Sequence, residues 1–333
     1  MKVLVLGGTG MLGAYSSLAL KSVGHEVVAA ARRQSDNGFF ADYGIDYVGG
    51  WNIEVPDTFS GLPTDLDAVV NMAGYMPAHG DSSAMPYVTS IVEGTVNLCE
   101  WLRARTSCRR VVFNTTPADI AAFAGTGPVP SDAPRSFPKN GGDHAVYAIC
   151  KVAATDLLEH YRIAYGFRPC VFRHMTVFGW HPNASFNVNG RTTVSPWRQV
   201  VRRALVGQPV EVWGDPGRCS ELLYIDDFTE AVCRAVASDA SGIYNLPGVR
   251  PYSLDEEFQT IIDVFGGARK SAKVYRPEKK VAATVLLDGA KTKRELGWSA
   301  VVPWCEACER IKSGMLQNRF AKIWGEADEE DRI

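Results

Sequence analysis

A tyrosine and a lysine stand four residues apart in the stretch HAVYAICKVAATD, which covers residues 144–156. On a helix, this spacing places the side chains of Tyr147 and Lys151 on the same face. The lysine charge can lower the pKa of the tyrosine, about 10 in isolation, and prepare its hydroxyl to exchange a proton with an alcohol. The pair therefore predicts acid/base chemistry that accompanies hydride transfer, with Lys151 also holding the ribose of a nicotinamide cofactor.

A hydroxyl that orients the substrate oxygen is expected at the carboxyl end of a neighbouring strand. The run RRVVFNTT, residues 109–116, ends on Thr115 and Thr116. Open parallel sheets bind their ligands in the crevice at this end of their strands. Both threonines are therefore candidate substrate-binding residues.

A glycine-rich turn follows the first apolar run of the chain, in VLVLGGTGMLG, residues 3–13. Its glycines allow a tight turn, let backbone N–H groups approach a pyrophosphate, and let the following helix pack on the strand. The strand–turn–helix context makes this a specific signal for a dinucleotide. The loop residues expected to contact the cofactor are Gly7, Thr9, Gly10, Met11, Leu12 and Gly13.

The end of the second strand, in AAARRQSD, bears on which dinucleotide is bound. NAD-selective sites usually carry an acidic residue here for the ribose hydroxyls, whereas this chain has Ala31. Arg32 and Arg33 follow it, and guanidinium groups bind phosphate oxygens in a bidentate manner. NADP(H) is therefore favoured and NAD(H) remains possible, with one of the two arginines on the 2′-phosphate.

Further cofactor contacts are expected at two other strand ends. Asn71, Ala73 and Gly74 close a later strand, where small residues let the dinucleotide cross the edge of the sheet. Asn52 is expected at the end of a further strand between those at 25–32 and 67–74, where it either meets the adenine or forms a turn.

Strand and helix signals alternate through the first half of the chain. Strands that are apolar throughout and alternate with helices predict a parallel sheet covered on both faces. Strands are expected at 2–7, 25–32, 67–74, 109–116, 168–179 and 242–248, and helices at 11–24, 86–105, 146–166, 196–207, 224–238, 253–266, 288–297 and 303–312. We expect an α/β fold with a Rossmann-like doubly wound sheet (1–179 plus about 224–248) and a smaller α+β substrate-binding lobe (about 180–223 plus 249–333).

Composition limits the possible partners. The formal charge of −2 gives no basic surface for nucleic acid, and no apolar run approaches the roughly 20 residues of a membrane span. The eight scattered cysteines suit reduced thiols in the cytoplasm. Cys305 and Cys308 form a C-x-x-C without a second pair nearby, so we expect them on a late helix and expect no metal site.

In their order along the chain, several motifs resemble the extended short-chain dehydrogenase/reductase family, in its NAD(P)-dependent epimerase/dehydratase group. The motifs are GGTGMLG, NMAG, EGTVNLCEWLR, the threonine pair, YAICK, FRHMTVFG, EVWGDPGRCSELLYIDD and AKTKRELGW. The resemblance spans nearly the whole chain and implies that Thr116, Tyr147 and Lys151 are the catalytic residues. It also implies a homodimer formed through the helices at 86–105 and 146–166.

The phrase PVEVWGDPGR before YIDD resembles family members that act on nucleotide-linked sugars. The resemblance implies that Trp213 lies against the substrate base, or else closes the lobe as a buried aromatic, and that Arg218 lies near the diphosphate. Relatives often carry Arg-Asp where Ser220 and Glu221 stand, which puts the phosphate contact in doubt. His174 is a further candidate substrate contact.

Departures from the family patterns narrow the reaction. The 4,6-dehydratases carry Asp-Glu directly after the catalytic threonine, where this chain has Pro117 and Ala118. Epimerase-reductases of the GDP-fucose synthase type place a cysteine and a histidine where Ala118 and Thr193 stand. Three histidines have no catalytic role implied by these patterns: His144, His174 and His181.

Two simple reactions remain. NADPH-dependent reduction of a keto-sugar is favoured by the arginine pair, and 4-epimerisation of a nucleotide sugar with a retained cofactor is the alternative. Small carbonyl or steroid-like substrates are less favoured. A dinucleotide-sensing protein without turnover is a remote alternative, because all three catalytic positions are occupied.

Overall fold

A parallel sheet organises the N-terminal part of the chain. The computed structural model describes residues 1–77, 83–136, 143–188, 191–279, 281 and 284–331. Its seven-stranded sheet has the order β14–β7–β5–β4–β1–β2–β3, and all its strand pairs are parallel. The strands are β1 (Lys2–Leu6), β2 (Glu26–Ala31), β3 (Asp46–Gly49), β4 (Ala68–Asn71), β5 (Arg110–Thr115), β7 (Arg168–His174) and β14 (Gly242–Leu246). The order changes direction between β1 and β4, where such sheets bind ligands.

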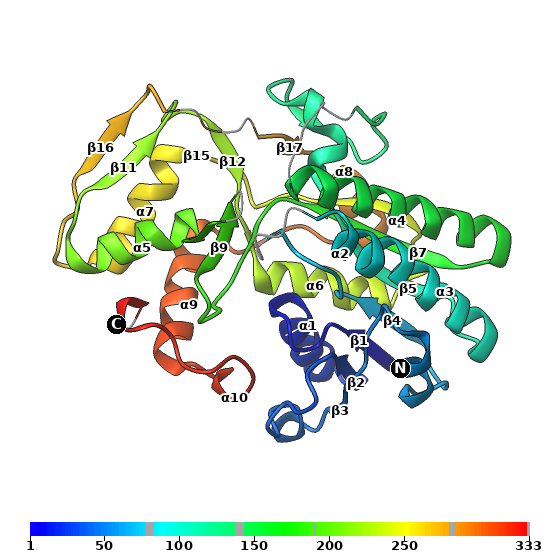
Figure 1. Ribbon diagram of the computed structural model, residues 1–333. Helices are drawn as coiled ribbons and strands as arrows, with labels where there is room; N and C mark the ends of the chain where they lie inside the picture. Colours follow the sequence, from blue (N-terminus) through cyan, green and yellow to red (C-terminus); the bar gives the residue numbers. More distant parts are fainter. Residues whose placement is uncertain (78–82, 137–142, 189–190, 280, 282–283, 332–333) are drawn as a thin grey trace.

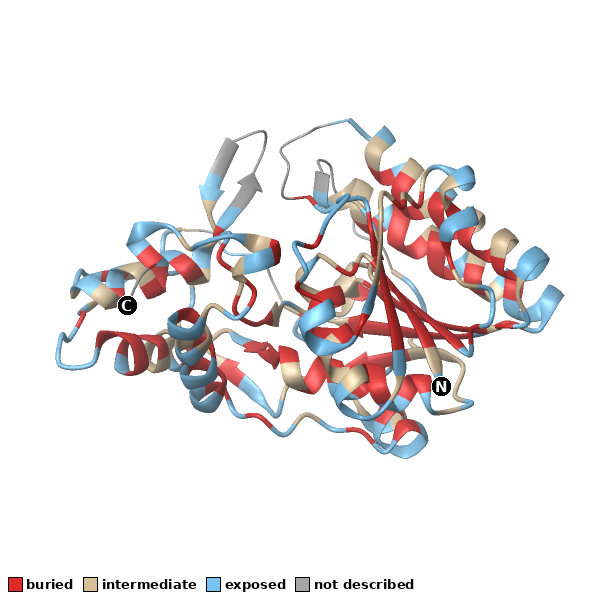
Figure 2. Cartoon of the chain, turned by 90° about the horizontal axis from the view of Figure 1, so that it is seen from below, coloured by how far each residue is buried: buried red, intermediate tan, exposed pale blue. Residues whose placement is uncertain are grey.

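The sheet is apolar on both faces and so builds two cores. In β1, Val3 and Val5 belong to the core on one side, while Leu4 and Leu6 belong to the core on the other. This division follows from the alternation of side chains along a strand. Figure 2 shows the buried strands running between helices whose outer surfaces are exposed. The predicted α/β fold class is thereby confirmed.

Helices cover each face in the way that the apolar pattern predicts. Helices α1 (Met11–Ser22) and α6 (Ile225–Val236) pack together on one face. Helices α3 (Gly94–Arg105) and α4 (Asp143–Tyr165) pack on the other. Figure 1 shows the two pairs on opposite sides of the strands. The carboxyl ends of the strands therefore lie between the N-terminus of α1 and the start of α4.

Residues 180–223 and 249–317 contain many of the elements outside the sheet, and we call them the C-terminal lobe. Helix α5 (Pro196–Val206) packs on α7 (Leu254–Gly266), and α7 packs on α9 (Trp304–Gln317). The short strand pairs are β9 (Ser185–Val188) with β10 (Arg191–Val194), β11 (Val210–Trp213) with β16 (Lys273–Arg276), and β12 (Cys219–Glu221) with β15 (Pro251–Ser253). Two further pairs join β8 (Val177–Phe178) to β13 (Leu223–Tyr224), and β6 (Pro128–Val129) to β17 (Leu286–Leu287).

The region predicted as one helix at 86–105 is divided. It begins with α2 (Met85–Tyr87), continues as a π-helical segment η3 (Val88–Glu93), and only then becomes α3. The hydroxyls of Thr89 and Ser90 donate to the carbonyls of Met85 and Pro86. These side-chain hydrogen bonds compete for acceptors of the regular helix, which accounts for the wider turn.

Two late helices, α7 and α9, have features that the sequence indicates. Ser253 accepts a hydrogen bond from the N–H of Glu256, whose carboxylate accepts one from the N–H of Ser253, so α7 begins with a complete capping box. Cys305 and Cys308 both lie on α9. Among the helices that the structure describes, none is long and apolar enough to cross a bilayer.

The end of the chain adds a feature that sequence patterns did not predict. After α9, the chain forms the short helix α10 (Ala321–Trp324) and the turn η5 (Glu329–Asp331). Figure 1 shows α10 reaching from the C-terminal lobe toward α1 and the loop after β2.

Candidate active site

Tyr147 and Lys151 lie one turn apart on α4 and face the carboxyl end of β5. The Nζ of Lys151 is 5.8 Å from the ring centroid of Tyr147 and 4.3 Å from that of Phe113. It donates a hydrogen bond of 3.2 Å to Oδ1 of Asn114. The strand therefore fixes the lysine ammonium beside the tyrosine, as the predicted chemistry requires.

Burial acts on both members of this pair. Lys151 is only 3% exposed, and burial lowers its pKa to about 7. Burial also raises the pKa of Tyr147 well above its ordinary value. A phenolate at Tyr147 is therefore disfavoured unless positive charge lies close to it, and Lys151 is the group placed to supply that charge.

The two threonines lie where β5 ends. Thr115 is 3% exposed, and its Oγ1 has no hydrogen-bond partner among the described residues. Thr116 is half-buried and caps the 3-10 segment η4 (Pro117–Phe123) by accepting a hydrogen bond of 3.3 Å from the N–H of Ala118. Because η4 packs against α4, both hydroxyls lie at the end of the sheet that faces the catalytic helix.

The glycine loop joins β1 to α1 as predicted, and the six residues predicted to contact the cofactor lie in this loop and the first turn of α1. Gly7 has a positive φ of 76°, and a Cβ there would lie 2.9 Å from the Met72 carbonyl oxygen. A Cβ on Gly13 would lie 2.2 Å from the Gly7 carbonyl oxygen. Gly10 caps α1 without a side chain, so the backbone N–H groups of the first turn can bind an anion.

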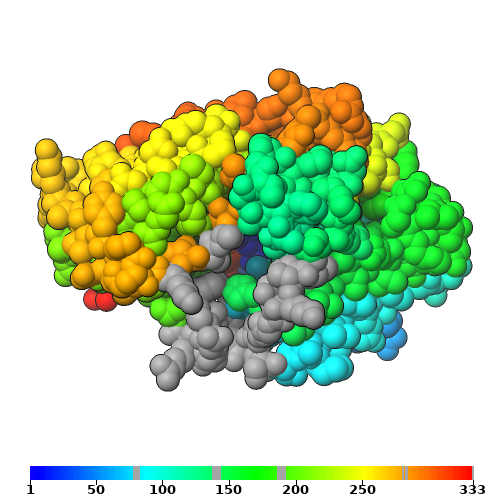
Figure 3. Space-filling view, turned by 90° about the horizontal axis from the view of Figure 1, so that it is seen from above, coloured from blue at the N-terminus to red at the C-terminus, as the bar shows by residue number. Residues whose placement is uncertain are grey.

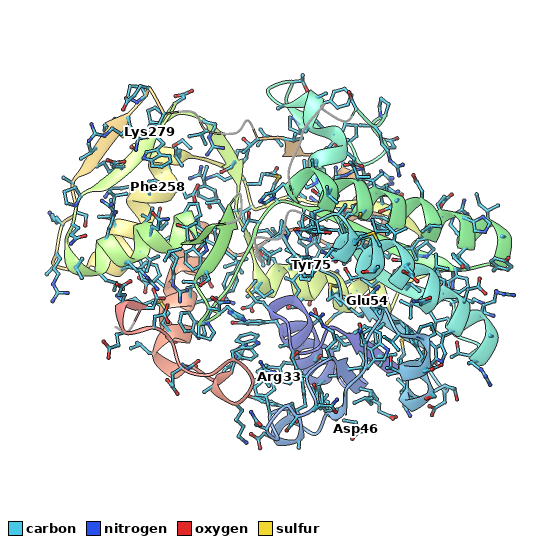
Figure 4. All side chains as sticks on the ribbon, in the orientation of Figure 1. Arg33, Asp46, Glu54, Tyr75, Phe258 and Lys279 are labelled. Carbon is cyan, nitrogen blue, oxygen red and sulfur yellow. The ribbon has the colours of Figure 1, made fainter. Side chains whose placement is uncertain are left out.

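The arginines after β2 lie differently from one another. Both side chains are exposed, but the guanidinium of Arg33 donates to the carbonyl of Ile323 in α10. Tyr47 donates a hydrogen bond of 2.5 Å to the Arg33 carbonyl and so fixes its backbone. Figure 4 shows Arg33 on the side of the sheet that faces α10. Of the two arginines predicted to contact a 2′-phosphate, Arg33 therefore already donates a hydrogen bond within the protein. The side chain of Arg32 makes no such hydrogen bond among the described residues.

The asparagines predicted at strand ends have local partners. Asn52 Oδ1 accepts a hydrogen bond of 3.2 Å from the N–H of Glu54. This is the geometry of a turn, which was one of the two roles expected for Asn52. Asn71 Oδ1 accepts from the N–H of Ala73 at 3.1 Å. Asn71, Ala73 and Gly74 follow β4 beside the glycine loop, since the Cβ position of Gly7 lies 2.9 Å from the Ala73 nitrogen.

The three histidines lie in different surroundings. His174 ends β7, donates through Nδ1 to the Met175 carbonyl at 2.7 Å, and has a buried Nε2 without a partner among the described residues. Burial lowers the pKa of His174 to about 4 and that of His181 to about 4. His144 is exposed at the start of α4. His174, beside β5 in the sheet, is therefore a neutral imidazole at the ligand-binding edge.

A cavity of about 630 Å³ separates the segment after β5 from the C-terminal lobe. Figure 3 shows the face on which this blue-green segment meets the yellow-green and orange segments of the lobe. The residues lining the cavity include Ala124, Gly125, Asp215, Arg218, Thr284 and Leu286. Arg218 therefore lies where an anionic part of a substrate could bind.

Trp213 lies outside that set of lining residues. Its side chain is 46% exposed, and its indole N–H donates to Glu211 at 2.8 Å. The Nζ of Lys279 lies 4.0 Å from its ring centroid. Figure 4 shows Lys279 at the outer end of the lobe, away from the central Tyr75. The stacking of Trp213 on a substrate base therefore stays a prediction. The alternative, in which Trp213 is a buried aromatic that closes the lobe, is wrong because the side chain is exposed.

Sequence reasoning missed two contributions to the site. Asn114 is a polar residue in the otherwise apolar run VVFN, and that break in the pattern is a signal that could have identified it. Trp324 donates a hydrogen bond of 2.7 Å from Nε1 to the carbonyl of Thr9 in the glycine loop. No local pattern connects residues so far apart in the sequence.

The sequence matches a known family over most of its length. Residues 3–246 match the sequence model of the NAD dependent epimerase/dehydratase family, and the chain belongs to that family. It is 24% identical to UDP-glucose 4-epimerase of Bacillus subtilis over 326 residues, which cover 90% of this chain and 92% of that protein.

Solved structures share the fold. The structure of UDP-glucose 4-epimerase from Thermotoga maritima with UDP-glucose matches with a TM-score of 0.78 at 19% identity, covering 96% of this chain and 99% of that one. The structure of UDP-glucuronic acid 4-epimerase from Bacillus cereus with UDP-glucuronic acid and NAD matches with a TM-score of 0.73 at 17% identity, covering 96% and 100%.

Family and geometry together define an NAD(P)-dependent enzyme of the short-chain dehydrogenase/reductase type. The residues present fit a dinucleotide. A Cβ on Gly7, Gly8 or Gly13 would lie 2.9 Å or less from a neighbouring atom, so the loop is closely packed at these glycines, as a dinucleotide-binding turn requires. Two buried polar atoms, Thr115 Oγ1 and His174 Nε2, lack partners among the described residues near the catalytic helix. Lys151 is placed to hold the ribose, and the first turn of α1 to hold the phosphates.

Proposed function

We propose that the protein is an NAD-dependent nucleotide-sugar 4-epimerase. This is the alternative to the keto-sugar reductase that the sequence favours. The observation that carries the proposal is the combination of Thr116, Tyr147 and Lys151 with relatives along nearly the whole chain that are themselves nucleotide-sugar 4-epimerases. The relatives and solved structures named above give no specific support to a reductase.

The catalytic residues can handle each proton of such a reaction. Thr116 orients the hydroxyl at C4 of the sugar, and Tyr147 removes its proton while Lys151 stabilises the phenolate. A bound nicotinamide supplies reversible acceptance of the hydride from C4. Once the resulting 4-keto-sugar has rotated in the site to present its other face, Tyr147 would return the proton to the C4 oxygen, and the nicotinamide, when bound, would supply the hydride to C4 from that face. The hexose leaves with C4 inverted and with no net oxidation.

The substrate class is proposed from the relatives and from the cavity between the segment after β5 and the C-terminal lobe. Arg218 lies in its wall, and a guanidinium binds diphosphate oxygens well. Family membership and the activities of the relatives support a nucleoside diphosphate hexose. Pro117 and Ala118 provide no acid or base after Thr116, which favours chemistry confined to the hydroxyl carbon over dehydration.

NAD is the cofactor that suits this reaction, because the same dinucleotide takes the hydride and gives it back. The neighbouring structure with UDP-glucuronic acid also contains NAD. Arg33, one of two residues on which the NADP(H) preference depends, already donates to the Ile323 carbonyl. Ala31 provides no carboxylate for the ribose hydroxyls, so we propose that other groups at this strand end hold them.

The test is direct. Purified protein is incubated with UDP-glucose, UDP-N-acetylglucosamine or UDP-glucuronic acid in deuterated water, without an added reductant, and the products are analysed by NMR. We expect the C4 epimer of one of them, without deuterium at C4, because the hydride returns from the cofactor. Tyr147→Phe should lower the rate by about three orders of magnitude while it still binds NAD.

The outcomes separate the two candidates. Consumption of NADPH by a nucleotide 4-keto-sugar, with no interconversion of C4 epimers, would overturn the epimerase in favour of the reductase. Deuterium at C3 or C5 of an epimerised product would indicate acid/base epimerisation instead. The nucleotide released from denatured protein, NAD or NADP, identifies the cofactor independently.

A further inference from the structure

The C-terminal segment 318–331 lies between the C-terminal lobe and the sheet. The chain leaves α9 at Asn318, whose φ of 39° turns it sharply. It then forms α10 against the sheet side of the molecule and returns to the lobe at Asp331 (Figure 1). The segment therefore crosses from one part of the molecule to the other and back.

Aromatic packing anchors the segment on the sheet side. Phe320 is fully buried, and its ring centroid lies 4.6 Å from that of Tyr15 on α1 and 5.4 Å from that of Phe39. Trp324 stacks on Phe320 at 4.2 Å. Because α1 begins at the glycine loop, this anchor attaches the segment to the helix that would bind the pyrophosphate.

The segment also contacts two of the structures predicted to hold the dinucleotide. Trp324 Nε1 donates to the carbonyl of Thr9, in the middle of the glycine loop, at 2.7 Å. Arg33, at the strand end that faces the adenosine ribose in such folds, donates to the Ile323 carbonyl. Asn37 Nδ2 donates to the Lys322 carbonyl at 2.7 Å.

A buried ion cluster anchors the other end of the segment in the lobe. Asp331 is 1% exposed. Its Oδ1 accepts from Nε of Arg198 at 2.9 Å and from Nε of Arg202 at 2.9 Å, and its Oδ2 accepts from Nη2 of Arg202 at 2.8 Å. Burial alone would raise the pKa of Asp331, but the hydrogen bonds from Arg202 and Arg198 lower it below its ordinary value. The carboxylate therefore stays charged and bonded at neutral pH.

We propose that Trp324 is a positioning residue for the glycine loop, and that segment 318–331 keeps the dinucleotide bound between turnovers. We take release of the dinucleotide to require relaxation of the glycine loop or movement of the lobe away from the sheet. The segment opposes both movements, because it is fixed to the loop at Trp324 and to the lobe at Asp331. The inference deepens the proposed function, since an epimerase has no need to exchange its cofactor whereas a reductase must exchange it at every turnover.

The experiment measures release of NADH from the full-length protein without any sugar. Dissociation is followed by nicotinamide fluorescence after mixing with excess unlabelled NAD, and the NAD content is measured after extended dialysis. Trp324→Phe keeps the aromatic stack but removes the donor to Thr9. We expect roughly tenfold faster release and loss of nucleotide on dialysis, with the midpoint of thermal unfolding little changed.

Trp298→Phe is the matched control. Trp298 is 2% exposed and donates from Nε1 to the carbonyl of Asp227 at 2.9 Å, away from the glycine loop. This variant should lower thermal stability and leave NADH release unchanged. Release that is equally slow in Trp324→Phe and wild type would overturn the proposal, as would equal acceleration in both variants, which would indicate general loosening.

Asp331→Asn tests the other anchor should Trp324→Phe fold poorly. It should also accelerate NADH release, whereas Asp328→Asn, at an exposed partner of Arg202, should not. Equal release rates in these two variants would overturn the role of the segment. Because no step involves a sugar, failure here leaves the epimerase proposal intact, and a failed epimerase assay leaves the release rates interpretable.

Discussion

At the scale of single residues, the site is defined by an ammonium group removed from water. Lys151 lies in the interior with Asn114 as its hydrogen-bond acceptor and the faces of two aromatic rings nearby. A buried ammonium is costly for the folded protein, but its field is strong because little solvent screens it. The same burial that lowers the pKa of Lys151 therefore makes it effective in stabilising a phenolate at Tyr147.

Lys151→Met should stabilise the protein without cofactor while abolishing activity. The pKa of Lys151 falls to about 7 in the folded state from about 10.4 in an unfolded chain. The cost of burial is thus fully present below about pH 7 and is relieved as the pH rises toward 10. We expect a gain of about 2 to 4 kcal/mol at pH 7 that shrinks by pH 9.5, measured by urea unfolding. A loss of stability at pH 7 would contradict this account.

Asn114→Ala should shift the pH dependence of catalysis. Without its acceptor, the charged form of Lys151 is less stable and its pKa falls further. At pH 7.5 we expect kcat to fall about tenfold or more, with partial recovery at pH 6, where more of the lysine is protonated. A pH–rate profile with NAD at saturation makes the measurement. A uniform loss at all pH values would assign Asn114 a purely structural role.

At the scale of elements, the sequence predicted the sheet well. Strand β1, for example, is apolar at every position from Val3 to Leu6, and this pattern is typical of a strand buried on both faces. The glycine loop and the pair on α4 were predictable because each depends on spacing within one element. The π-helical turn at Val88–Glu93 was not predictable, because it depends on whether hydroxyls bond to the preceding carbonyls.

Two glycines of the loop should respond differently to alanine. A Cβ at Gly13 would lie 2.2 Å from the Gly7 carbonyl oxygen, so the loop must move. A Cβ at Gly10 would lie 3.3 Å from the same atom, at a φ of −80° that alanine adopts readily. We expect Gly13→Ala to weaken NADH binding by about 100-fold or more, and Gly10→Ala by about tenfold or less, measured by fluorescence titration. Equal weakening of NADH binding in both variants would show that the close contact between position 13 and the Gly7 carbonyl is not what requires glycine there.

At the scale of the whole molecule, the contacts that join the C-terminal lobe to the sheet were the least predictable part. Trp324 reaches Thr9 across 315 residues of sequence, and the composition near either residue does not encode the pairing. Arg33 illustrates the same limit. A guanidinium after β2 suggested a contact with a cofactor phosphate, but in the structure it donates a hydrogen bond to the Ile323 carbonyl in α10. The predicted homodimer remains a prediction at this scale, as does the position of the domain boundaries.

A contact within the C-terminal lobe depends on pH. Glu221 is 5% exposed, and its Oε1 accepts from the N–H of Leu287 at 3.2 Å. Leu287 belongs to β17, which pairs with β6 in the segment after Thr116. The Oε2 of Glu221 has no partner within the described part of the chain. Burial raises the pKa of Glu221 to about 8, so this carboxyl is mostly protonated at neutral pH.

Glu221→Gln should therefore stabilise the protein in alkaline solution. Because the folded state binds the proton of Glu221 more tightly than the unfolded state, wild-type stability falls as the pH rises from about 4.5 to about 8. The glutamine variant lacks this loss, so we expect it to be more stable than wild type by about 1 to 3 kcal/mol at pH 8.5 and nearly equal at pH 5.5. Glu256→Gln is the control. The hydrogen bond from the Ser253 N–H is the largest of several that lower the pKa of Glu256 to about 2. That variant should lose stability equally at both pH values, and a similar gain in both variants at pH 8.5 would refute the role of Glu221.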